Sequence, residues 1–304
     1  INTYTTSYQS AFQVLNLNNS NFVVIWTSHL QDGSEEGIYG QIYQEDGTAI
    51  GSEFRINTVT SGNQTQPSAI ATEDGGFYVV WSSNSSSHGS NSWDVFGQRI
   101  DSSGNKIGSE EQINTFETSF QRNPGITEAG NGEALVLWST ANHDDGLGGG
   151  VAGKFISYND APIITSDAHE INFENSLQKI NKFASISSLS DGNIIIVGWE
   201  SDLPNSNLII QIFNDSGLKL IDPISIHTRQ GEIPSINNLG NMMRPNIAIL
   251  SENKYIVSWS DDQKNYAKIF TNNNFLVSDY SSDILGYSSQ NFQSSPLSNG
   301  NIFF

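Results

Sequence analysis

The chain has 304 residues, of which 36% are hydrophobic and 15% are charged, and its 32 Asp and Glu against 13 Lys and Arg give a formal net charge of −19. An acidic chain of this kind repels nucleic-acid phosphate and anionic lipid, so we expect no nucleic-acid partner and no membrane insertion. The absence of cysteine excludes disulfides, a thiol nucleophile and thiolate metal sites.

An internal repeat dominates the sequence. Five tryptophans follow one another at intervals of 55, 57, 61 and 60 residues, and each ends an apolar run and precedes small polar residues. Near-constant spacing of this length indicates a solenoid, a propeller or an array. These five residues are Trp26, Trp81, Trp138, Trp199 and Trp259. We expect them to form the structural core of the repeats, since a buried indole removes a large apolar area from water.

The first segment of each repeat begins near a proline. Pro67, Pro124 and Pro245 each lie 14 residues before their tryptophan, and Phe12 takes that place in the first repeat. Proline lacks the N–H that a central strand needs, so it fits the start or the edge of a strand. The spacing therefore predicts a strand that starts near each proline and ends at a turn.

Three further segments complete each repeat. The apolar run with the tryptophan predicts a strand that is buried on both faces. It is followed by an alternating segment, such as residues 39–43 and 96–100, and then by a segment such as residues 54–58 and 112–115. The turns between them are rich in Asp, Asn and Gly, which tolerate the positive φ of tight hairpins. No segment shows sustained helical periodicity.

Four antiparallel strands in each repeat match the blade of a β-propeller. The chain begins with Ile-Asn-Thr, which recurs at residues 56–58 and 113–115 at the end of a repeat, so it starts on a fourth strand and we expect it to be cut from something longer. We predict an all-β fold in which residues 1–304 form a single propeller of five complete blades and one composite blade shared by the chain ends. The predicted blades are 7–58, 63–115, 121–173, 180–228 and 241–285, with the composite blade from 1–4 and 290–304.

The repeat resembles a known family. Its consensus Gly-Gly-Phe-x-Val-Val-Trp-x-Ser, followed by Val-Phe-Gly-Gln-Arg and Ile-Asn-Thr, is clearest over residues 1–120. It is similar to a tandem repeat of very large secreted bacterial proteins that also carry hemolysin-type (RTX) and adhesin modules. The resemblance implies export and an extracellular or cell-surface location. The chain lacks the Asp-containing glycine nonapeptide of the RTX calcium roll, so that calcium mechanism is not implied.

The loops that follow the tryptophans are the candidate functional region. Equivalent loops of a propeller emerge on one face, and a rigid scaffold positions them. Their carboxylates, Asp32, Glu35, Glu36, Asp144 and Asp145, are hard oxygen ligands of the kind that Ca²⁺ prefers. Calcium is therefore the one candidate cofactor, and a set of solvated acidic turns is the alternative.

The same loops carry candidate contacts to a ligand. Trp93 is the only tryptophan outside the regular spacing, and Asp94 follows it. An aromatic ring among small polar residues stacks on a sugar or inserts into a partner protein, unless the loop packs down on its blade. His29 and His143 lie in equivalent loops and are further candidates, with exposed loop histidines as the alternative.

The repetition argues for a scaffold, because a catalytic site would occur once. The motifs Gly-x-Ser-x-Gly and His-Glu-x-x-His are absent. We predict a module without enzyme activity, used for extracellular binding or assembly in a large secreted bacterial surface protein such as an adhesin or a surface filament. Its partners would be other protein subunits or cell-surface glycans. The alternatives are a secreted glycan-binding or glycan-processing enzyme on a propeller scaffold, and an inert structural spacer.

Overall fold

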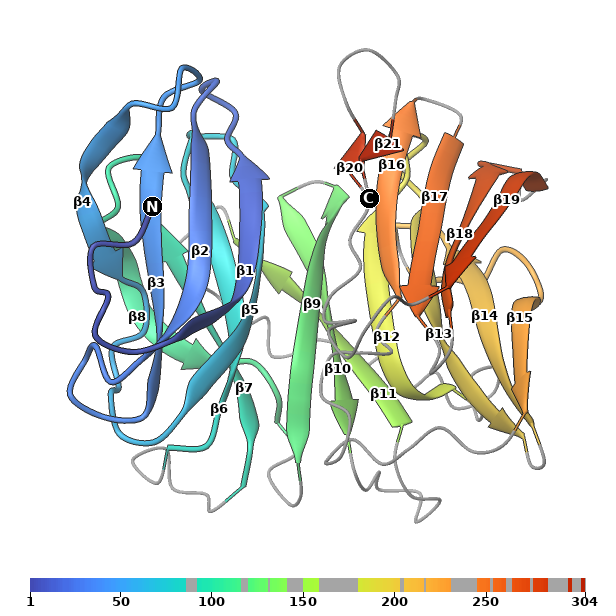
Figure 1. Ribbon diagram of the computed structural model, residues 1–304, viewed down its shortest axis with the longest axis horizontal. Coiled ribbons are helices and arrows are strands. Elements are labelled where there is room, and N and C mark those ends of the chain that lie inside the picture. Colours follow the sequence, from blue (N-terminus) through green and yellow to red (C-terminus); the bar gives the residue numbers. More distant parts are fainter. Residues whose placement is uncertain are drawn as a thin grey trace. The chain divides into compact units, whose positions relative to one another are not determined.

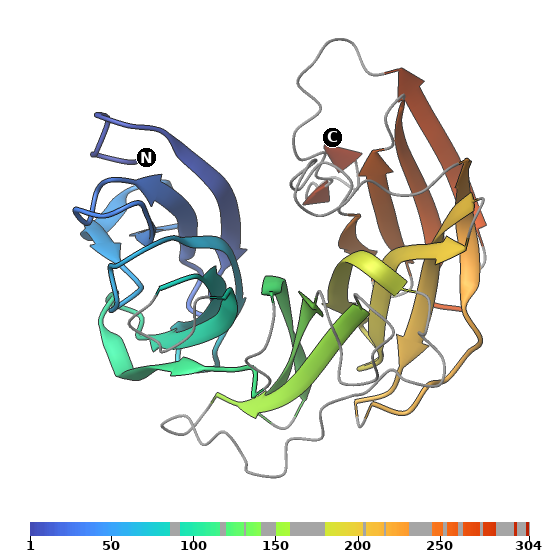
Figure 2. The same ribbon diagram turned by 90° about the horizontal axis from the view of Figure 1, so that it is seen from below.

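The computed structural model consists of two compact units (Figures 1 and 2). Unit 1 comprises Ile1–Gly148 and Ala152–Glu170, and unit 2 comprises Gly149–Val151 and Ile171–Phe304. The residues that the structure describes are 1–85, 92–115, 120–130, 132–140, 150–158, 180–202, 205–215, 217–230, 245–251, 254–260, 264–273, 276–283, 295–296 and 302–303. Over these residues the regular elements are all β-strands, and none is a helix of the length and apolarity needed to span a membrane.

Unit 1 contains two four-stranded sheets and nearly all of a third sheet. Sheet A is formed by β1 (Gln9–Asn16), β2 (Phe22–His29), β3 (Glu36–Tyr43) and β4 (Ala49–Arg55). Sheet B is formed by β5 (Gln64–Ala71), β6 (Phe77–Ser83), β7 (Asp94–Ile100) and β8 (Lys106–Gln112). Sheet C has β9 (Gln121–Gly130), β10 (Glu133–Thr140) and β11 (Gly150–Ser157). The fourth strand predicted for the third blade falls outside the described residues.

Unit 2 repeats the same plan. Sheet D is formed by β12 (Ile180–Ser188), β13 (Ile194–Asp202), β14 (Asn205–Phe213) and β15 (Ile224–Gln230). Sheet E is formed by β16 (Asn246–Ser251), β17 (Lys254–Ser260), β18 (Lys264–Thr271) and β19 (Leu276–Asp283). A short hairpin, sheet F, joins β20 (Ser295–Pro296) to β21 (Ile302–Phe303). Strands that follow one another in sequence pair antiparallel within each sheet.

The predicted all-β fold of four-stranded antiparallel sheets is thereby confirmed. The number of blades and the closure of a ring remain predictions. The first four residues form no strand; the Thr3 N–H donates to Glu53 Oε2 at 2.6 Å, at the end of sheet A in unit 1.

The hydrophobic core of unit 1 lies between successive sheets. Val23 and Ile25, on one face of sheet A, share a core with Trp81 of sheet B. On the other face of sheet B, Val80 shares a core with Trp138 of sheet C. In unit 1, the face of a sheet that carries its tryptophan therefore packs against the preceding sheet, on the face of that sheet that does not carry its own tryptophan. Burial of an aromatic side chain of this size contributes several kcal/mol, of the order of 3–5 by truncation.

The first strand of each sheet in unit 1 carries the same irregularity. Ala11, Gln66 and Asn123 have φ of 46°, 60° and 57°, and each lies 15 residues before its tryptophan. They sit at β-bulges, where the register of the ladder shifts. The prediction that strands start near the prolines needs a correction, because Pro67 and Pro124 lie inside β5 and β9. A bulge leaves a residue unpaired, so the missing proline N–H removes no ladder bond.

Sheet D departs from the repeat by one residue. The turns before the tryptophan strands are closed by the carbonyls of Asn21, Gly76 and Asn193. Trp26 and Trp81 come five residues after that closing residue, whereas Trp199 comes six residues after it. Successive side chains of a strand point to opposite faces, so one extra residue moves the indole to the other face.

Strand pairing confirms the shift. Gln98 on β7 pairs with Val79, two residues before Trp81, whereas the equivalent Gln211 on β14 pairs with Ile196. Counting two residues on from Ile196, Gly198 occupies the tryptophan position in sheet D. Trp199 lies instead on the face that shares a core with Trp259 of sheet E.

The shift also changes how a buried amide is satisfied. Gln98 Nε2 donates to the carbonyls of Arg99 at 3.1 Å and Ile107 at 2.9 Å, and so joins strands β7 and β8. Gln211 is fully buried, yet neither its Nε2 nor its Oε1 has a hydrogen-bond partner in the described part of the chain. An unsatisfied buried amide costs about 1–3 kcal/mol.

Candidate functional site

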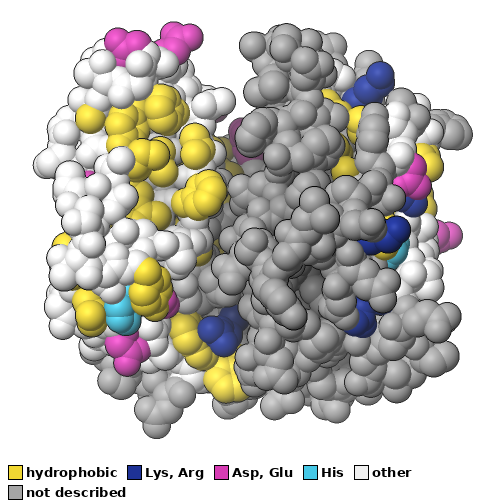
Figure 3. Space-filling view, in the orientation of Figure 1, with side chains coloured by type: hydrophobic (Ala, Val, Ile, Leu, Met, Phe, Trp, Pro, Cys, Tyr) yellow, Lys and Arg dark blue, Asp and Glu magenta, His cyan; other side chains and the backbone are white. Residues whose placement is uncertain are grey.

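The candidate site is a group of aromatic and charged side chains in unit 1, called here the aromatic–charged cluster. Its members come from the residue before β1, the end of β2, the start of β3, the residue before β7, and β9. They are Tyr8, His29, Glu36, Trp93 and Arg122. In the lower left part of Figure 3, a histidine lies between apolar side chains with an acidic side chain beside it.

One half of the cluster is built on sheet A. The rings of Tyr8 and His29 stack with centroids 4.6 Å apart and an interplanar angle of 13°. The Tyr8 hydroxyl donates to Glu36 Oε1 at 3.0 Å, and the Tyr8 side chain is 54% exposed. Partial burial and the bond to Glu36 raise the pKa of Tyr8, so the phenol stays a hydrogen-bond donor at neutral pH. His29 Nδ1 is buried without a partner among the described residues.

The other half pairs Trp93 with Arg122. The guanidinium carbon lies 3.9 Å from the centre of the Trp93 ring, a cation–π geometry. The Gln121 N–H donates to the Trp93 carbonyl at 2.7 Å, which ties this loop to β9. Burial lowers the pKa of Arg122, and the Glu36 carboxylate opposes that shift. Glu36 is therefore within electrostatic range of both halves.

The loop carboxylates of sheet A do not converge on one point. Asp32 Oδ1 accepts the Ser34 N–H at 3.1 Å within its own loop, and Glu35 accepts a hydrogen bond from the Asn63 side-chain amide. Over the described residues, no three His, Asp or Glu side chains are grouped closely enough to hold a metal ion. His143, Asp144 and Asp145 lie outside those residues, so calcium binding by that loop stays a prediction.

Asp94 belongs to the scaffold. It is 1% exposed, and its Oδ1 accepts a hydrogen bond from Asn114 Nδ2 at 2.8 Å. Asn114 Oδ1 in turn accepts the Val95 N–H at 2.7 Å. This network holds the start of β7 to the segment after β8, and it places Trp93 at the edge of the sheet.

Tyr8 and Arg122 were not among the candidates that the loop analysis selected. Arg122 lies 16 residues before Trp138, where the first two repeats have Ser10 and Thr65. A large cation at a position that is small and polar in the first two repeats is a departure from those repeats. Departures of this kind are the signal that would have identified Arg122 from the sequence.

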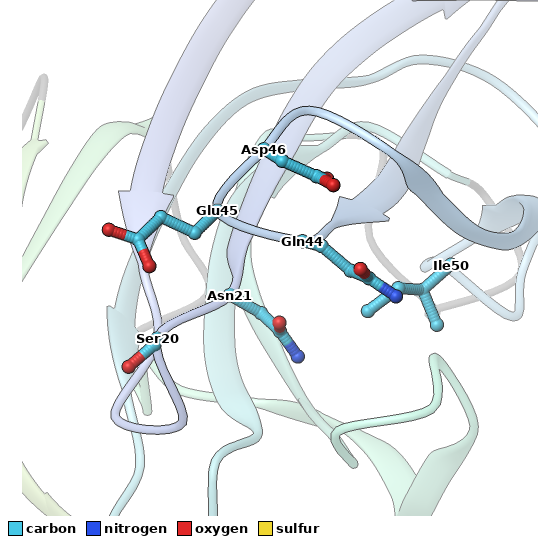
Figure 4. A pocket seen from close by; sticks show the side chains of 6 residues that line it. All are labelled: Ser20, Asn21, Gln44, Glu45, Asp46 and Ile50. Atoms are coloured by element: carbon cyan, nitrogen blue, oxygen red, sulfur yellow. The ribbon is translucent and has the colours of Figure 1, made fainter.

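A concavity lies at two hairpin turns of sheet A, apart from the cluster (Figure 4). It is lined by Ser20, Asn21, Gln44, Glu45, Asp46 and Ile50. Asp46 Oδ1 accepts the Thr48 N–H at 2.9 Å, a bond that lowers the pKa of Asp46 and closes its own turn. The Asp46 carboxylate of this concavity is therefore accounted for by turn formation, and the aromatic–charged cluster, which combines aromatic rings with charges of both signs, is the better candidate site.

Comparisons with known proteins identify the fold. No protein-family model matches the sequence, and no curated protein matches it. A protein of unknown function from Dyadobacter fermentans is similar in structure, with a TM-score of 0.60 and 11% identity over 95% of this chain and 87% of that one.

Two enzymes are also similar in structure. The NanB sialidase of Streptococcus pneumoniae has a TM-score of 0.59 and 9% identity over 97% of this chain, which spans only 64% of the sialidase. The α-L-arabinanase of Penicillium chrysogenum has a TM-score of 0.52 and 13% identity over 89% of this chain and 75% of that one. At these identities the likeness concerns the fold alone. The chain thus has a repeated, propeller-like all-β fold of four-stranded antiparallel sheets.

Proposed function

We propose that this chain is a glycan-binding module of a large secreted bacterial surface protein, and that the aromatic–charged cluster is its binding site. The observation that carries the proposal is the placement of stacked and partly exposed rings next to a carboxylate and a guanidinium. The secreted, cell-surface location is supported by the resemblance of the repeat.

The chemistry of the cluster suits a sugar. The apolar face of a pyranose ring stacks on an aromatic ring, while its hydroxyls need donors and acceptors at the ring edge. Tyr8 is 54% exposed and is held by His29 on one side, so a stacking platform is already ordered. Glu36 supplies an acceptor beside it. A preordered site loses less side-chain entropy when a ligand binds.

Binding is favoured over hydrolysis by the directions of the two neighbouring carboxylates. Glycoside hydrolysis needs two carboxyl groups that face the same bond, about 5–10 Å apart. Glu35 and Glu36 are adjacent, but Glu36 bonds to Tyr8 and Glu35 to Asn63, at the start of sheet B. A glycan-processing enzyme that uses the same cluster remains the second candidate, because the Tyr8–Glu36 bond is a polarised pair at an exposed surface.

A glycan array followed by calorimetry tests the proposal. We expect the full chain to retain at least one oligosaccharide class, and we expect Tyr8→Ala and Trp93→Ala each to weaken binding by at least about fivefold. Phe12→Ala is the matched control, since Phe12 is an aromatic side chain of sheet A that is 59% exposed and lies outside the cluster.

Two outcomes contradict the proposal. An array on which nothing is retained favours the inert spacer. Turnover of a polysaccharide that is lost in Glu36→Gln establishes the enzyme instead.

A further inference from the structure

We infer that the ligand of the aromatic–charged cluster is an acidic sugar, whose carboxylate binds the guanidinium of Arg122. This inference rests on the proposed function and names the substrate class of the same site.

Arg122 is a half-buried cation of unit 1, and the Glu36 carboxylate acts on its charge only at a distance. Over the described residues it has no ion pair and no side-chain hydrogen bond, its Nε is buried without a partner, and its one close contact is the face of Trp93. Arg99, by comparison, donates to Asp74 Oδ2 at 2.8 Å, and Arg55 Nε donates to the Asn57 carbonyl at 3.1 Å. A half-buried guanidinium that lacks such partners carries a desolvation cost, which an anion from outside would relieve.

The composition makes this arrangement unusual. Acidic residues outnumber Lys and Arg by 32 to 13, so carboxylate partners are plentiful in the chain. Glu36 acts on Arg122 at a distance, whereas its Oε1 accepts the hydrogen bond of the Tyr8 hydroxyl at 3.0 Å. Over the described residues, no carboxylate forms an ion pair with Arg122, and a carboxylate from a ligand would supply one.

The geometry favours a carboxylate on a sugar ring. A guanidinium presents its N–H groups in a planar fork that matches the two oxygens of a carboxylate. The guanidinium of Arg122 lies over the face of the Trp93 ring, with its carbon 3.9 Å from the ring centre. Glu36 repels an anion on the Tyr8 side and accepts hydroxyls there. A uronic acid meets both requirements, with its carboxylate on Arg122 and its hydroxyls toward Glu36.

The test compares two hexasaccharides by calorimetry with the full chain, an oligogalacturonate and a neutral hexasaccharide. We expect the oligogalacturonate to bind at least about tenfold more tightly, since a hydrogen-bonded charge pair contributes more than a neutral contact. Arg122→Gln should remove that preference, so that the two hexasaccharides bind this variant with affinities within about twofold of each other. Arg55→Gln is the matched control, because it removes one positive charge from sheet A outside the cluster.

A measurement on the unaltered chain tests the inference even if the Arg122→Gln variant does not fold. Methyl esterification of the oligogalacturonate, which removes the charge of its carboxylates, should abolish its tighter binding to the unaltered chain. Equal affinity for both sugars, or a preference that Arg122→Gln retains, overturns the inference while the proposed function stands. A sulfated oligosaccharide that binds more tightly than the uronate also overturns the choice of a carboxylate. Binding of no sugar overturns both.

Discussion

Sheet B of unit 1 and sheet D of unit 2 start from the same repeat and differ by one residue between a turn and a tryptophan. In sheet B the indole of Trp81 packs toward sheet A, whereas in sheet D the indole of Trp199 shares the core with Trp259 of sheet E. The apolar runs of the two sheets look alike in the sequence. The face of the sheet on which a side chain lies depends on how many residues separate it from the preceding hairpin turn. Tryptophans at a nearly constant interval in the sequence therefore do not all point to the same face of their sheets.

The polar partners changed together with the register. In sheet B, Asn114 accepts the Val95 N–H and binds Asp94. The equivalent residue of sheet D is His227, whose ring lies 5.9 Å from Trp199, 5.4 Å from Trp259 and 4.5 Å from Tyr266, centroid to centroid. Contacts between aromatic rings around His227 in sheet D thus replace the hydrogen bonds that Asn114 makes in sheet B. The kind of interaction at this position therefore differs between the two sheets, and so does burial, since Asn114 is buried and His227 is half-buried.

The largest effects should come from the tryptophans themselves. Trp81 and Trp199 are both fully buried, so Trp81→Ala and Trp199→Ala should each lower the free energy of unfolding by about 3–5 kcal/mol in urea titrations. The register shift adds a sharper expectation. Trp199→Ala and Trp259→Ala should be non-additive by about 0.5–3 kcal/mol, because both indoles line one core.

Trp81→Ala combined with Trp259→Ala is the control for that cycle, since these residues belong to different cores and their effects should add. Additivity of the Trp199 and Trp259 substitutions would show that the two rings do not share a core, and the comparison between the sheets would fail.

The buried glutamines should respond in opposite directions. Gln98→Leu removes an amide that bonds two carbonyls, and we expect a loss of about 1–3 kcal/mol in the free energy of unfolding. Gln211→Leu removes an unsatisfied amide, and we expect no loss or a small gain. Thermal melts of the two variants under one condition check the pair. Equal losses would mean that the Gln211 amide is satisfied in solution.

The smallest effect concerns acid stability of the two hairpin turns. The Thr72 hydroxyl, the Gly76 N–H and the Arg99 guanidinium bind the Asp74 carboxylate and lower its pKa from 3.8. A folded-state pKa below the unfolded one stabilises the fold above about pH 4, and this stabilisation disappears as the pH falls through the folded-state value. Asp74→Asn should therefore reduce the acid dependence of the unfolding free energy between pH 6 and pH 3 by up to about 1 kcal/mol, a small amount because the carboxylate is half exposed.

Sheet D supplies the control. Asp191 holds the same place in its turn, but Leu189 and Ile212 stand where sheet B has Thr72 and Arg99, and neither can donate a hydrogen bond. Asp74→Asn should therefore change the acid dependence more than Asp191→Asn does. A larger change there than in Asp74→Asn would exclude the hydroxyl and the guanidinium as the cause.

The strand order could be predicted from the sequence because it depends on local signals. Apolar runs, Asp-Gly turns and the recurrence of Ile-Asn-Thr fix four strands per repeat without knowledge of tertiary contacts. The bulges at Gln66 and Asn123 were not predicted, since a positive φ before proline has no simple compositional mark. The register of sheet D was missed because aligning on the tryptophans hides the extra residue after the turn.

The candidate site was predicted in part. Trp93 and His29 were selected from the loops as ligand contacts and Glu36 as a calcium ligand, and all three are members of the cluster; their roles stay predictions. Tyr8 and Arg122 lie on first-strand segments, far from those loops in sequence, and only the fold brings them there. Asp94 looked like a surface carboxylate, but its backbone position starts a strand, and its side chain is sealed against Asn114.

The bulges with positive φ have a consequence for the concentrated protein. In each four-stranded sheet the first strand is an outer strand, so its free N–H and C=O groups could recruit a strand from another molecule. A bulge interrupts the regular spacing of the N–H and C=O groups along the strand edge. Pro67 in β5 and Pro124 in β9 each lack an N–H donor there. In sheets A, B and C, the bulge that lies next to the tryptophan strand should therefore keep the edge strands of neighbouring molecules from pairing into fibrils.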